Sequence, residues 1–283
     1  MASLSATAPG RVIEIPPGAI EERVLDYDLA IEVPNTIVNV GAGARVTILE
    51  RLHGTTDHNV VPRTEINAGE NAHVSYTVLE TFGPGTVVTS QRTSNARTGA
   101  HVAWNIALLG GSASDEIVAK QDGAGAECEI AALFFPVARE SVQLTTEVQH
   151  NVPHTTSQTV VRSIAAGHGR GRYYGNIRIA AHAHGSEASL RDDTLLIGKD
   201  AKIDAIPALE IAANDVKAFH GATVGAIDEE HIFYLMSRGI ERDAAEKLIA
   251  LGFFEPAVAR FPGEELRAEL RALLEEKLVG ARR

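Results

Sequence analysis

His220, followed by Gly221, lies where the pattern of residues 215–240 changes from a strand to a helix. Alternation along the strand places Val216, Ala218 and His220 on one face. Two interpretations of this histidine remain open. Imidazole is a suitable iron ligand, so His220 could be a metal ligand. It could equally be a neutral core histidine that donates one ring nitrogen to a carbonyl group.

Four other histidines occur in pairs. His182 and His184, in "HAHG", are expected on one strand face, where a divalent ion could bridge them. Surface histidines with no carboxylate nearby are more often unliganded, which favours unliganded side chains here. His150 and His154 flank a proline, and turn structure accounts for that pair.

Asp192 and Asp193 resemble a pair of catalytic carboxylates, as in carbohydrate-cleaving β-helix enzymes. Neighbours in an extended strand point to opposite faces, so these two cannot act on one bond. Cys128, the only cysteine, shares its strand phase with Ala126 and Ile130, which predicts a buried, unreactive thiol. A single cysteine excludes an internal disulfide and a site of several thiolates within one chain.

A repeat in the first half indicates the elements that position these residues. Each copy has a Gly or Asn, then Ala, then a short alternating strand. Successive alanines are 28, 28 and 26 residues apart, as expected for a chain that winds a solenoid. The copies are "GARVTI" (43–48), "NAHVSY" (71–76), "GAHVAW" (99–104) and "GAECEI" (125–130).

We therefore predict a parallel β-helix, with a β-sandwich or jelly roll as the alternative. Further along, strand-like segments follow one another about 15 residues apart, near residues 185, 200 and 214. Either the coil gains sides there or the register of the repeat has been lost.

After residue 227 the apolar period changes from 2 to 3.6. A helix is expected from Asp228 to Gly239, a second ending before Gly252, and a third over residues 263–278. We predict a β-helix core over residues 1–227, with a short N-terminal lead-in, and a helical module over residues 228–283. So small a module should pack on the last coil or on a partner chain.

Composition restricts the possible functions. The formal charge is −11 and the pI about 5.5. The chain therefore lacks the excess of basic residues with which proteins bind phosphate backbones, which argues against nucleic-acid binding. The sequence has no run of 18 apolar residues, and its start lacks the pattern of a signal peptide. We expect a cytoplasmic protein with no membrane partner.

The C-terminal half resembles the SufB/SufD family, the scaffold components of the Suf iron-sulfur cluster assembly machinery, and is more similar to the SufD branch. The resemblance is carried by "DVKAFHGATVGAIDEEHIFYLMSRGI" (215–240), "AAEKLIALGFF" (244–254), "HNVPHTTSQ" (150–158), "RYYGNIRI" (172–179), "DTLLIG" (193–198) and "AIPALEI" (205–211).

This resemblance implies a right-handed parallel β-helix that pairs with a second such chain and carries the ATPase SufC on its C-terminal helices. It also implies cluster assembly between a SufB-like and a SufD-like chain, with His220 at the position of the SufD-branch histidine. The chain departs from the family pattern at three places. Asp192 replaces a SufB-branch Cys, Gly221 replaces a SufB-branch Glu, and Ala218 replaces a Cys common in the SufD branch.

The favoured hypothesis is a non-catalytic scaffold subunit that pairs with itself, as a homodimer, or with a SufB-like chain and docks a SufC-type ATPase. The alternative is a β-helix metal- or carbohydrate-acting enzyme. His220 is the candidate cluster-assembly ligand at a subunit interface. One imidazole cannot hold an iron-sulfur cluster without further ligands, so a Cys-bearing partner would have to supply them. The isolated chain is expected to bind no cofactor tightly.

Overall fold

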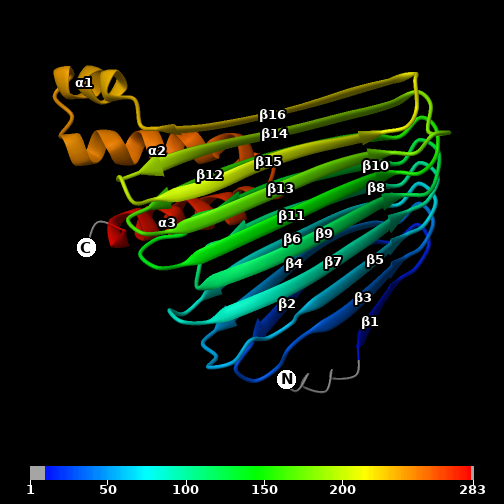
Figure 1. The fold of residues 1–283 in the computed structure, drawn as a ribbon. Coiled ribbons are helices and arrows are strands. Elements are labelled where there is room, and N and C mark those ends of the chain that lie inside the picture. The colour runs from blue at the N-terminus through cyan, green and yellow to red at the C-terminus, as the bar shows by residue number, and fades with distance from the viewer. Residues whose placement is uncertain (1–9, 282–283) are drawn as a thin grey trace.

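A computed structural model describes residues 10–281, so most of the predicted N-terminal lead-in, residues 1–9, lies outside the described residues. Strands fill the chain as far as Ala226 and form two stacked parallel sheets (Figure 1). The odd sheet contains β1 (Arg11–Ile15), β3 (Asn35–Val40), β5 (Arg63–Ala68), β7 (Val87–Ala96), β9 (Ser112–Gln121), β11 (Ser141–His150), β13 (Arg170–Ile179) and β15 (Lys202–Ile211). The even sheet contains β2 (Ile20–Asp28), β4 (Arg45–Gly54), β6 (His73–Phe82), β8 (His101–Leu108), β10 (Glu127–Phe134), β12 (Thr156–Ala166), β14 (Ser186–Ile197) and β16 (Val216–Ala226).

The repeat found in the sequence is the even sheet. Its four copies are the starts of β4, β6, β8 and β10, and corresponding residues are direct partners in register: Val46, Val74, Val102 and Cys128. In each copy the residue before the shared alanine has a left-handed backbone, with φ between 54° and 70°. Glycine and asparagine adopt this conformation at low cost. These residues are Gly43, Asn71, Gly99 and Gly125. The predicted parallel β-helix is confirmed, and the sandwich alternative is wrong.

The shorter spacing near residue 200 has a simple cause. The segments near residues 185, 200 and 214 are β14, β15 and β16, and β15 belongs to the opposite sheet. Each coil therefore has two strands throughout, and the expectation that the coil gains sides is wrong. Glu187 on β14 pairs with Lys217 on β16, so one full coil still takes 30 residues.

Alternation along each strand sends every second side chain into the narrow space between the sheets. Apolar residues from both sheets fill this interior, and the rings of Tyr76 and Trp104 on successive coils lie 5.3 Å apart. Stacked coils thus bury a continuous core that no single coil could bury alone.

Three helices follow the last coil: α1 (Glu229–Ser237), α2 (Arg242–Val258) and α3 (Glu264–Gly280). The side chain of Asp228 caps α1 by accepting from the Glu230 amide at 2.8 Å, and Gly239 ends that turn with φ of 86°, both as predicted. The expected stop at Gly252 is wrong. Helix α2 runs on to Val258, and its Leu248 side chain is 53% exposed. Within residues 10–281 the structure contains no helix with the length and hydropathy of a membrane span.

Helices α2 and α3 pack on several coils of the even sheet, whereas the expectation was the last coil or a partner chain. Helices α2 and α3 lie along the outer face of the even sheet (Figure 1), where Phe254 packs on Phe135 and Leu270 is fully buried. Polar contacts of two α3 residues, Glu269 and Lys277, hold this helix on early coils of the solenoid. Arg51 on β4 donates to Glu269 at 2.7 Å, and the Lys277 ammonium group contacts the carbonyl oxygen of Leu109 and the carboxylate of Glu140, each at 2.8 Å.

Candidate functional site

His220 lies on β16, the outermost strand of the even sheet. Its register partner on β14 is Leu190, and the neighbouring Val216 and Ala218 pack against the interior core, so the imidazole belongs to the interior face of the last coil. The side chain is half-buried, and its Nδ1 atom has no hydrogen-bond partner among residues 10–281. Gly221 follows without a side chain. This nitrogen is thus a buried polar atom that no group among the described residues satisfies.

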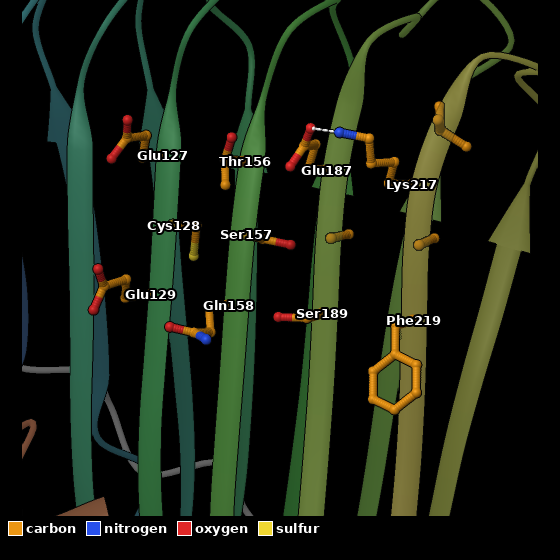
Figure 2. Close-up of a pocket in the computed structure, with 13 residues that line it drawn as sticks. Glu127, Cys128, Glu129, Thr156, Ser157, Gln158, Glu187, Ser189, Lys217 and Phe219 are labelled. Atoms are coloured by element: carbon orange, nitrogen blue, oxygen red, sulfur yellow. Dashed lines mark hydrogen bonds and ion pairs between the residues drawn. The ribbon is translucent and has the colours of Figure 1, made fainter.

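The other face of β16 borders a shallow groove of about 600 Å³ on the outside of the even sheet (Figure 2). Phe219, 60% exposed, forms one wall, and the Lys217 ammonium group pairs with Glu187 at 2.5 Å. Figure 2 shows Glu127 and Glu129 on the far side of the same groove. The carboxylates of Glu127, Glu129 and Glu187 lie on this surface beside apolar side chains.

Cys128 lies beneath that groove and does not face into it. Its side chain is 3% exposed and packs in the interior, and burial raises the pKa of its thiol to about 12. The prediction of a buried thiol is confirmed, and a thiolate nucleophile is disfavoured at this position.

Asp192 and Asp193 point to opposite faces of β14, as predicted. Asp193 faces outward, where it accepts from Arg191 at 2.8 Å and from Thr223 at 2.6 Å. Asp192 is fully buried in the interior, and neither of its carboxylate oxygens has a hydrogen-bond partner within the described residues. Burial raises the pKa of Asp192 to about 7, against the opposing effect of Arg162. The two acids cannot work together as a catalytic pair.

His150 and His154 have different environments. His150 ends β11 fully buried, with Nδ1 at 2.8 Å from the Thr155 hydroxyl and Nε2 at 2.9 Å from the Ser157 hydroxyl. Burial lowers the pKa of His150 to about 4. His150 is a satisfied core histidine, and a turn alone does not explain it. His154 does lie in the turn that follows, with φ of 60°.

His182 and His184 lie in a turn between β13 and β14, and both are exposed. The expectation that they share a strand face is therefore wrong. No group of three or more metal-ligating side chains comes together anywhere in residues 10–281. A metal centre built from this chain alone has no support in that part of the molecule.

The last coil is uncovered within residues 10–281, because β15 and β16 end their sheets. Several apolar side chains on these two strands are exposed. They are Ile206 at 38%, Ile211 at 42%, Val224 at 48% and Phe219 at 60% exposure. Alternation showed these strands to be apolar, but only the strand order reveals that they end the solenoid.

Fold and site together define a β-solenoid protein with an open final coil, a histidine in that coil and helices along one sheet. Residues 24–253 match the family model described as "SUF system FeS cluster assembly, SufBD core domain", and the chain belongs to this SufBD family.

The chain is similar to several curated relatives. It is 31% identical over 249 residues to the iron-sulfur cluster assembly protein SufD of Escherichia coli, covering 87% of this chain and 59% of that protein. It is 29% identical over 256 residues to the SufBD family protein Rv1461 of Mycobacterium tuberculosis, covering 90% and 30%. A Staphylococcus epidermidis SufBD family protein is 27% identical over 258 residues, covering 87% and 54%. The chain thus spans less than two thirds of the length of each.

Proposed function

We propose that this chain is a non-catalytic scaffold subunit of a Suf-type iron-sulfur cluster assembly complex. The observation that carries the proposal is the match to the SufBD core over residues 24–253, which includes the strand of His220. The chemistry of the site supports it. Residues 10–281 contain no group of three or more metal-ligating side chains, and Asp192 and Asp193 point to opposite faces of their strand.

Pairing would take place at the last coil. Strands β15 and β16 end their sheets, so one edge of each backbone has unused hydrogen-bonding groups. Exposed Ile211 and Phe219 add apolar area beside these edges. A second solenoid would cover them, either an identical chain or a SufB-like one. His220 would then lie near the partner, whose cysteines would supply the thiolates that a cluster requires.

Helix α1 is the proposed dock for a SufC-type ATPase. Only Ile232 of this helix is buried, whereas Phe233 is 74%, Tyr234 56% and Met236 44% exposed. Exposed aromatic and methionine side chains clustered on one short helix are typical of a protein interface. ATP hydrolysis would belong to that partner.

Anaerobic co-expression with a SufC-type ATPase and a Cys-bearing SufB-like chain tests the proposal. We expect the three chains to copurify and the complex, but not the isolated chain, to hold iron and sulfide after reconstitution. Truncation of the chain after Ile227, which removes residues 228–283, should abolish ATPase capture. If the full chain forms no complex with either protein, the proposed function is wrong.

A further inference from the structure

Four charged side chains lie inside the solenoid, far from the last coil. They come from both sheets: Glu50 on β4, Glu80 on β6, Arg92 on β7 and Asp115 on β9. Each is at most 2% exposed. Buried charges are costly unless they are paired, so the contacts among these four side chains decide their ionisation.

Arg92 pairs with two of the three acids. Its Nη2 atom donates to Glu80 Oε1 at 2.8 Å, and its Nη1 atom donates to Asp115 Oδ2. The Ser90 hydroxyl donates to the same Glu80 oxygen at 3.2 Å. One guanidinium group balances one carboxylate, so two negative charges would remain if all three acids were ionised.

Glu50 has no ion pair of its own within the described residues. Neither of its oxygens has a partner at hydrogen-bond distance and angle, although the hydroxyl groups of Tyr76 and Thr64 lie beside it. The second oxygen of Glu80 and one oxygen of Asp115 also lack partners there. Carboxylates in such surroundings are more stable when they are protonated.

We propose that this cluster is an internal binding site for two protons, one on Glu50 and one on Glu80, that links the stability of the solenoid to pH. Arg92 then balances Asp115, and no net charge remains buried. Among the described residues, the other titratable groups facing the cluster are Tyr76 and, through it, Tyr27 on β2. Both are phenols, which are neutral below about pH 10 and so do not alter this balance.

The expected pH dependence follows from the pKa values of the two acids. Burial raises the pKa of Glu50 to about 7, and burial with the neighbouring Asp115 raises that of Glu80 to about 8, in both cases against Arg92. The value for an unfolded chain is 4.5. Between pH 4.5 and about pH 8 the folded state therefore binds more protons than the unfolded state. The free energy of unfolding therefore decreases as pH rises from about 4.5 to about 8.

Thermal unfolding between about pH 6 and pH 9 tests the site with the full chain. The melting temperature of wild type should decrease as pH rises across this interval. The double variant Glu50→Gln/Glu80→Gln, which carries permanently neutral isosteres, should lose less and should exceed wild type at the alkaline end. Glu116→Gln, an exposed acid on β9, is the matched control and should follow wild type. Equal pH slopes in wild type and the double variant would overturn the proposal.

Infrared spectroscopy of the wild-type chain at neutral pH gives a readout that needs no folded variant. We expect a C=O band from protonated carboxyl groups, which exposed acids do not give at this pH. Either single variant, Glu50→Gln or Glu80→Gln, should reduce the band, while Glu116→Gln should not. A folded wild type without the band would also overturn the proposal, whether or not the chain joins a Suf-type complex.

Discussion

His220 is the direct register partner of Leu190 and ends a column of interior side chains that runs through seven coils. Each of the five members between the two ends has a neighbour in the column on both sides. The column consists of Ile48, Tyr76, Trp104, Ile130, Thr159, Leu190 and His220. At this open end of the column, His220 is only half-buried.

The first prediction separates an assembly role for His220 from a packing role. His220→Ala should cost less than ~1 kcal/mol, because Nδ1 has no hydrogen bond to lose within the described residues. Leu190→Ala, one coil inward and 1% exposed, should cost ~2–5 kcal/mol. In a complex with a Cys-bearing partner, His220→Ala should nevertheless hold less iron. Unchanged iron with a strongly lowered melting temperature would identify His220 as a core residue.

The second prediction concerns the exposed face of α1. Phe233→Ala/Met236→Ala should weaken binding of a SufC-type ATPase at least ~10-fold, because buried aromatic anchors dominate interface energies. The melting temperature should stay constant, since both side chains are exposed. Val279→Ala, on α3 and 50% exposed, is the control. Titration calorimetry measures the affinities for the ATPase. Equal affinities of wild type and the double variant would place the dock elsewhere.

The third prediction tests the attachment of the helices to the even sheet. Phe254 is fully buried, and its ring lies 6.0 Å from that of Phe135. Phe254→Ala should destabilise the chain by ~3–5 kcal/mol in denaturant unfolding. Leu248→Ala on the same helix should change stability by less than ~0.5 kcal/mol, because Leu248 is 53% exposed. Similar losses for both variants would contradict the packing described for α2.

The fourth prediction is a loss of stability in acid caused by His150. Burial lowers the pKa of His150 from 6.5 to about 4, so the unfolded chain binds a proton that the folded chain excludes. The contribution of His150 to stability should therefore decrease as pH falls from about 6.5 to about 4, by an amount on the order of 3 kcal/mol, and is measured as the difference between wild type and variant. His150→Gln should reduce this decrease, whereas His184→Gln, in an exposed turn, should retain it. Melting curves across that interval provide the check.

The repeat was predictable from the sequence because the turn before each of these even strands needs a left-handed residue. That position is therefore Gly or Asn, and the alternating strand follows directly after the next alanine. The sequence pattern could not show that the chain reverses into a second sheet every half coil. The docking face of the helices did leave a signal that was overlooked. In "IALL" and "IAALFF" the alternation gives way to a continuous apolar run, as expected for strands buried on both faces.

The candidate site was only partly predictable. The position of His220 followed from alternation, and the opposite directions of Asp192 and Asp193 followed from strand geometry. The internal charge cluster left no comparable signal. Arg92 lies in the polar stretch "TSQRTSN", which has the composition of an exposed strand, and its partners are 12 and 23 residues away in sequence. Only the stacking of coils brings them together.

The position of α3 has a consequence for synthesis of the chain on the ribosome. Glu269 pairs with Arg51 across 218 residues, and Lys277 pairs with Glu140 across 137. The early coils must therefore form and persist while their outer face is still bare, until the last part of the chain emerges. During that interval the apolar face around Leu79 and Leu133, later covered by the helices, is open to chaperones or to aggregation.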